Sequence, residues 1–142
     1  MKPVLQALLL ADHVYEDRTG KKIIAGTFSR LWFKKVPPPQ EVAGERRMPL
    51  QGVTVAGSPY IFISLTELRG RQKYVLRYVN LETDTQIFQV DFAAECDNPL
   101  QTVEVVIPLP PLPAAKAGAH AFELLCENEP IGSLRILVEE AP

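Results

Sequence analysis

The chain has 142 residues, with 15 Lys and Arg against 17 Asp and Glu, so its formal charge is 15 − 17 = −2. This charge gives no broad attraction to nucleic acid or to anionic lipid, and 46% hydrophobic residues are too many for a disordered chain. Thirteen prolines and eight glycines leave little room for long helices, and the length fits a single domain over residues 1–142.

Residues 4–14 are apolar at nearly every position, which fits either a strand buried on both faces or a helix. Pro3 suits the first turn of a helix, whereas the turn at 18–21 and the β-rich run 22–33 suit a strand. Gly26 lies inside that run, where a glycine often marks a bulge or a close backbone approach. The run is short, is interrupted by Gln6 and lacks a clear small-residue cleavage site, so a buried element is favoured over a signal peptide. No stretch approaches the roughly 20 apolar residues of a membrane span. We therefore expect a cytoplasmic protein with no membrane partner.

Alternating apolar and polar residues predict half-buried strands from the middle of the chain to its end. The runs 59–68 and 73–79, joined through Gly70, predict a hairpin. Turns at roughly ten-residue spacing and about eight strands predict an all-β, antiparallel two-sheet sandwich of the immunoglobulin-like or C2-like kind. The later strands are expected around residues 88–92, 103–107, 122–126 and 134–138.

Two segments interrupt this pattern. Residues 34–58 predict one long irregular loop, which is either a solvated crossover or a functional segment. Residues 108–113 contain four prolines, which favour an extended path that crosses from one sheet to the other.

Several motifs resemble a family of small bacterial proteins that is known only as a domain of unknown function. The resemblance covers most of the chain and implies an all-β fold, and it brings no known activity, cofactor or catalytic residue. The motifs that carry it are residues 7–15, Asp17, residues 19–21, 23–28 and 65–70, Gly118, residues 122–124 and residues 131–133.

The sequence contains no phosphate-binding glycine loop and no nucleophile elbow. His13 lies beside Asp12, but adjacent residues of a strand point to opposite faces, so the two are not expected to converge on a metal. A second acidic set lies at the two ends of one predicted strand, where solvated turns are favoured over a calcium site; its members are Glu82, Asp84, Glu95 and Asp97. We therefore predict no catalytic residue, no metal, no cofactor and no enzymatic activity.

The two cysteines, Cys96 and Cys126, do not show metal-ligand spacing, and Cys126 is predicted to be a buried thiol. Basic residues gather around Gly70, with two tyrosines interleaved, which is a pattern of single-stranded nucleic-acid binding. However, Tyr74 and Tyr78 fall on the opposite face from Lys73 and are interpreted as core residues, so no nucleic-acid partner is expected.

Two functional hypotheses remain. The first is a non-catalytic protein-interaction or structural module that docks through residues 108–113 or through an exposed sheet edge, with a homodimer as its simplest form. The second is a small-ligand binder or enzyme with an apolar pocket under the loop 34–58. The candidate lining residues are Trp32, Phe33 and Tyr60, with Arg46 or Arg47 as a polar anchor, and the alternative is that the three aromatic side chains close the core.

Overall fold

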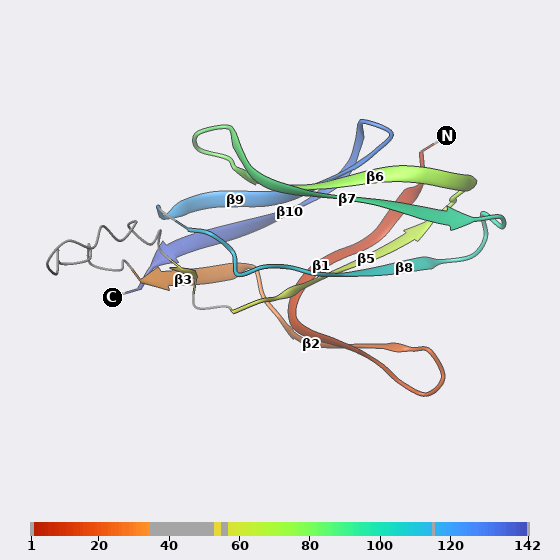
Figure 1. Ribbon diagram of the computed structural model, residues 1–142, viewed down its shortest axis with the longest axis horizontal. Helices are drawn as coiled ribbons and strands as arrows, with labels where there is room; N and C mark the ends of the chain where they lie inside the picture. The colour runs from red at the N-terminus through yellow and green to blue at the C-terminus, as the bar shows by residue number, and fades with distance from the viewer. Residues whose placement is uncertain (1, 35–52, 55–56, 115, 142) are drawn as a thin grey trace, which may run out of the picture.

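The computed structural model describes residues 2–34, 53–54, 57–114 and 116–141. Within these residues the chain forms ten strands and no helix, rather than the about eight strands expected from turn spacing. The strands lie in two sheets, and Figure 1 shows the two layers. The predicted all-β class with two sheets is therefore confirmed.

The strands divide unequally between the sheets. One group comprises β1 (Val4–Glu16), β2 (Lys22–Thr27), β5 (Tyr60–Thr66) and β8 (Val103–Pro108). The other comprises β3 (Arg30–Lys34), β4 (Val53–Thr54), β6 (Gly70–Asn80), β7 (Thr85–Cys96), β9 (Gly118–Cys126) and β10 (Glu129–Glu140). The four-stranded sheet has the order β2-β1-β5-β8, and the six-stranded sheet has the order β4-β3-β10-β9-β6-β7.

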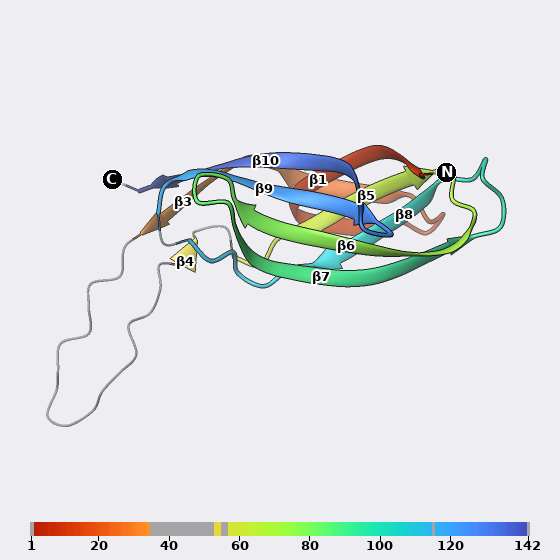
Figure 2. The same ribbon diagram turned by 90° about the horizontal axis from the view of Figure 1, so that it is seen from above.

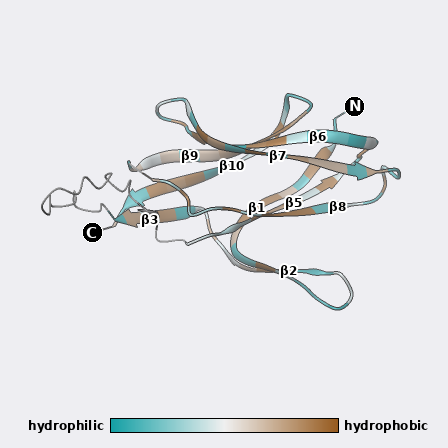
Figure 3. Ribbon diagram, viewed as in Figure 1, coloured by the Kyte–Doolittle hydropathy of each residue, from teal (hydrophilic) through white to brown (hydrophobic). Residues whose placement is uncertain are grey.

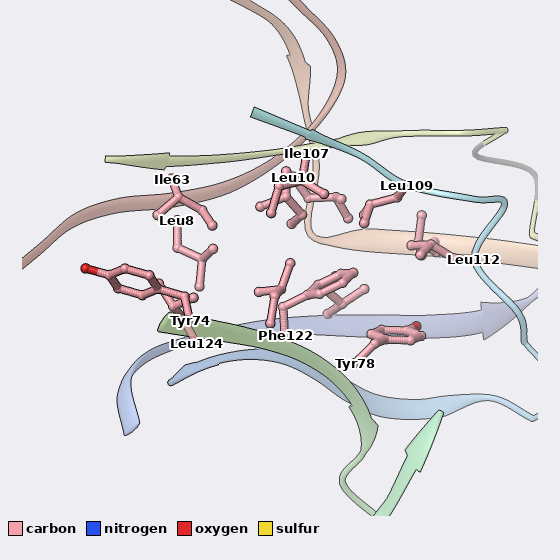
Figure 4. Close-up of a cluster of buried hydrophobic side chains, with 14 of the residues drawn as sticks. Leu8, Leu10, Ile63, Tyr74, Tyr78, Ile107, Leu109, Leu112, Phe122 and Leu124 are labelled. Atoms are coloured by element: carbon pink, nitrogen blue, oxygen red, sulfur yellow. The ribbon is translucent and has the colours of Figure 1, made fainter. Parts of the chain in front are cut away.

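The hydrophobic core lies between the two sheets. In Figure 4, Leu10 and Ile63 of the four-stranded sheet point toward Phe122 and Leu124 of the six-stranded sheet, and all four are buried. Every second side chain of a strand points to the same face, so the apolar side chains at alternate positions point into this space. In Figure 3 hydrophilic residues gather at the tips of the hairpin loops and apolar residues gather along the strands.

The N-terminal apolar run, for which both a strand and a helix were considered, forms strand β1. It is hydrogen-bonded on both sides, to β2 and to β5, so its backbone groups are satisfied in the sheet. Leu8 and Leu10 share the core face, while Leu9 on the opposite face is half-buried. The nearly continuous apolar run therefore encodes a central strand whose core face is buried and whose opposite face is partly buried.

The predicted hairpin of residues 59–68 and 73–79 is wrong. β5 pairs with β1 and β8, whereas β6 pairs with β7 and β9, so the two strands belong to different sheets. The connection turns a corner, with Glu67 and Gly70 at positive φ (63° and 70°) and with Leu68 fully buried between them. A short connection containing glycine suits a hairpin and a corner equally well, so local sequence does not separate the two.

The proline-rich segment crosses between the sheets, as predicted. It follows β8 in the four-stranded sheet and precedes β9 in the six-stranded sheet. Leu109 and Leu112 are 4% and 0% exposed and belong to the core, whereas Pro110 and Pro111 are exposed. The two leucines that would anchor this segment on a partner are therefore already buried in its own domain.

One strand pair departs from the antiparallel expectation. β3 runs parallel to β10, with Leu31 beside Val138, because the chain has crossed from β2 in the other sheet before β3 begins. Most of the predicted loop 34–58 lies outside the described residues. Within it, β4 is described and pairs antiparallel with the end of β3.

Candidate functional site

Trp32 and Phe33, which were predicted to line one aromatic pocket, point to opposite sides of the sheet. They are neighbours on β3, and neighbours on a strand face opposite sides of the sheet. Phe33 is 1% exposed and lies in the core, whereas Trp32 is 44% exposed on the outer face. Tyr60 is half-buried in β5 of the other sheet, and Arg46 and Arg47 lie outside the described residues. The structure therefore does not bring the three aromatic side chains into one pocket.

Trp32 does line a shallow depression of about 240 Å³ at the corner where the chain passes from β2 to β3. The Arg30 guanidinium carbon lies 5.7 Å from the centre of the indole ring, and Arg30 Nη2 donates to Glu139 Oε1 at 2.9 Å. Phe28 and Asp12 also line the depression. Its chemistry is thus an aromatic wall beside one carboxylate and one guanidinium.

Gly26 brings Asp12 into this depression. Its φ is +74°, and a Cβ built on it would lie 2.5 Å from Asp12 Oδ2. The glycine thus allows β2 to pass directly under the carboxylate. The sequence predicted either a bulge or a close approach at this glycine, and the close approach is what the structure contains.

The histidines and the acidic residues beside them do not converge. His13 in β1 stacks on Tyr15 with ring centres 5.6 Å apart, and His120 in β9 is buried against Tyr78 at 5.5 Å. The two rings therefore belong to different sheets. Among the described residues, no group of three or more His, Cys, Asp or Glu side chains has an arrangement that could hold a metal ion.

The second acidic set is split as well. Glu82 and Asp84 precede β7, while Glu95 and Asp97 lie at its far end. Residues 85–94 separate Asp84 from Glu95, which spans roughly 36 Å at about 3.3 Å per residue. No single ion can contact both pairs.

The tyrosines of the basic segment are core residues, as predicted. Tyr74 and Tyr78 are 1% and 0% exposed, and burial raises the pKa of both hydroxyls. Arg77 lies on the outer face, where its Nη2 is 3.3 Å from Glu123 Oε1. The aromatic and basic side chains thus occupy opposite faces of β6 and form no stacking platform.

Both cysteines are unpaired thiols in sheltered positions. Cys126 is 4% exposed, and burial raises its pKa, which confirms the predicted buried thiol. Cys96 donates to the carbonyl oxygen of Asn98 at 3.2 Å. The buried environment of Cys126 does not favour a thiolate nucleophile.

The free edge of β7 is the feature that sequence reasoning did not locate. β7 has 12 residues and, among the described strands, pairs only with β6; Figure 2 shows it along the margin of the six-stranded sheet. Its sequence contains no Lys, Arg or Pro, and its charged side chains are Asp91 and Glu95. Its pairing with β6 is regular from Phe88 to Cys96, and Ile87 is skipped in the register and forms a bulge.

The other sheet edges offer less to a partner. β4 has two residues, β2 has six and carries Lys22, and β8 has six and ends at Pro108. Alternation in residues 88–92 was visible in the sequence. Its position at an edge depends on the order of strands in the sheet, which alternation does not encode.

The described residues thus form an all-β domain with two sheets, one exposed tryptophan depression and one long free edge. Within the described part of the chain, no helix has the length and apolarity needed to span a membrane.

The chain belongs to a family of unknown function (DUF6941), whose profile matches residues 6–139. The resemblance stated from the motifs is therefore confirmed. No curated protein matches the chain.

Two solved structures are similar in backbone. An immunoglobulin-like protein from Pseudomonas aeruginosa has 8% sequence identity and a TM-score of 0.44, and the alignment covers 97% of each chain. An alkylpurine DNA glycosylase from Pseudomonas fluorescens, bound to DNA with an abasic site analogue, has 16% identity and a TM-score of 0.37 over 58% of this chain and 26% of the glycosylase.

Proposed function

We propose that this protein is a non-catalytic interaction module that binds an extended protein segment along the free edge of β7. The observation that carries this proposal is a 12-residue edge strand with no Lys, Arg or Pro, which has one hydrogen-bonded neighbour among the described strands. An added strand pairs its backbone with such an edge, and alternate side chains supply the specificity.

The inner face of β7 supports the same proposal. Phe88, Val90 and Phe92 pack against the core but remain only half-buried. A strand added beside β7 would cover more of these side chains, and each Å² of apolar surface removed from water contributes about 25 cal/mol.

Backbone amide exchange tests the proposal directly. In an antiparallel edge strand, every second N–H points away from the neighbouring strand and exchanges with solvent. We expect selected extended peptides to protect these alternate amides within residues 88–96 and to shift their NMR signals. Peptides that bind while leaving β7 amides unprotected would refute the proposal.

The depression beside Trp32 supports a second candidate function, the binding of a small ligand. Trp32 is the only tryptophan in the chain, so ligand binding there would change the intrinsic tryptophan emission. A ligand titration of the native chain, with Arg30→Ala as the comparison variant, tests this candidate. Ligands that raise the melting temperature without changing the emission of Trp32 would place their site elsewhere.

A further inference from the structure

We infer that the partner of β7 is β7 of a second copy of this chain, paired antiparallel about a two-fold axis at Phe92. This inference rests on the proposed function of the β7 edge and adds the identity and register of the partner. The resulting sheet would be continuous across the two copies and would contain twelve strands, six from each.

The length of the regular pairing places the axis. β7 follows β6 without interruption from Phe88 to Cys96, and the bulge at Ile87 ends this regular stretch. A two-fold axis pairs residue i with residue j and residue j with residue i. The longest regular ladder that residues 88–96 can form with themselves therefore has their midpoint, Phe92, on the axis.

Charge selects the same register. With Phe92 on the axis, Asp91 faces Ala93 of the second copy, and Glu95 faces Gln89. Moving the axis to residue 91 would place Asp91 against Asp91, and moving it to residue 93 would place Asp91 against Glu95. Like charges directly opposite each other destabilise a strand pair. Both neighbouring registers are therefore disfavoured.

The aromatic side chains are continuous in this register. Phe92 stacks on Tyr74 within one copy, with ring centres 5.1 Å apart and an interplanar angle of 10°. Two Phe92 rings meeting at the axis would extend this stack into a row of four rings. Aromatic pairs directly across two strands are among the more favourable side-chain pairs of a sheet.

A charge pair of variants tests the register without disturbing the core. Ala93 is exposed and lies opposite Lys73 within the same sheet. Ala93→Asp would face Asp91 twice across the axis, and we expect the dimer dissociation constant to rise about tenfold. Ala93→Lys would face Asp91 favourably, so its dissociation constant is expected to stay unchanged or to fall.

Within one copy, a charge at residue 93 meets Lys73 on the neighbouring strand and Asp91 and Glu95 on its own face, so its effect on monomer stability has two opposing parts. The melting temperature of each variant, measured in the same buffer, therefore separates loss of the dimer from unfolding. The double variant Asp91→Lys with Ala93→Asp restores opposite charges across the axis and is expected to restore the dimer. Sedimentation equilibrium over a range of protein concentrations at low salt measures each constant.

Crosslinking locates the axis independently. In a Cys96→Ser background, a short bis-thiol reagent should link copies of the double variant Gln89→Cys with Glu95→Cys, since these positions face each other. Each single variant, and the pair Gln89→Cys with Ala93→Cys, should give little product. Crosslinking of that last pair alone would move the axis to residue 91 and overturn the inference.

The outcomes separate this inference from the proposed function. A chain that stays monomeric at every concentration, or equal dimerisation of Ala93→Asp and Ala93→Lys, overturns the second copy as partner. If extended peptides still protect the β7 amides in that case, the interaction module stands. If neither peptides nor a second copy protect them, both conclusions fail.

Discussion

Replacing Leu112 with alanine tests whether the proline-rich crossover is part of the core. Leu112 is 0% exposed and packs in the hydrophobic cluster between the two sheets, as Figure 4 shows. Truncating a buried leucine removes apolar contacts and leaves a cavity, at a cost of about 2–5 kcal/mol in the free energy of unfolding. We expect a value within this range for Leu112→Ala.

Thermal and urea unfolding measure this change. The entropy of unfolding is about 2.1 cal/mol/K per residue, so for this chain 1 kcal/mol corresponds to roughly 3 °C in Tm. Leu112→Ala should therefore lower Tm by roughly 6–15 °C. Pro111→Ala is the matched control, because Pro111 is exposed one residue away and its replacement should cost at most about 1 kcal/mol, through unfolded-state entropy.

Equal and small effects of the two substitutions would refute the placement of Leu112 in the core. They would instead favour the crossover as a free extended segment, which is one of the two docking elements predicted from the sequence. A large effect of Leu112→Ala with a small effect of Pro111→Ala would show that the crossover is held in the core. Of the two predicted docking elements, only the sheet edge would then be available to a partner.

Three further changes test local features by chemical and thermal unfolding. Gly26→Ala should destabilise by about 1–3 kcal/mol because of its positive φ and the close Asp12 carboxylate, and adding Asp12→Ala should recover part of the loss. Asn128→Gly should stabilise the turn between β9 and β10 by up to about 1 kcal/mol, since Asn128 has φ of 68°. Burial raises the pKa of Tyr74 and Tyr78, so these tyrosines ionise at lower pH in the unfolded chain than in the folded chain. The free energy of unfolding should therefore fall as the pH rises above about 10, and Tyr74→Phe and Tyr78→Phe should each make this fall smaller.

The sequence was sufficient for features that depend on local periodicity. Alternation identified the strands from residue 59 onward, and the buried positions of Tyr74, Phe122 and Cys126 follow from it. Gly26 was identified as a bulge or a close approach because glycine inside a strand often marks one of these two features. Each of these inferences needs only the residues within one strand or turn.

Features that depend on which strands become neighbours were not predictable in this way. The corner at Leu68 was interpreted as a hairpin because a turn sequence does not reveal whether the next strand stays in the same sheet. The orientation of the predicted pocket residues was missed for a related reason. Trp32 and Phe33 were grouped because both border the loop 34–58, although adjacent residues of a strand face opposite sides.

The free edge of β7 unites these two kinds of information. Its composition, with no Lys, Arg or Pro, is readable in the sequence, but it acquires meaning only because β7 lies last in the sheet order. In a central strand the same residues would simply pair on both sides. At an edge they leave one row of backbone groups without a strand neighbour among the described residues, and the bulge at Ile87 limits the regular part of that row to residues 88–96. The position of a single irregularity therefore decides both where a partner strand can pair and which residue would lie at its centre.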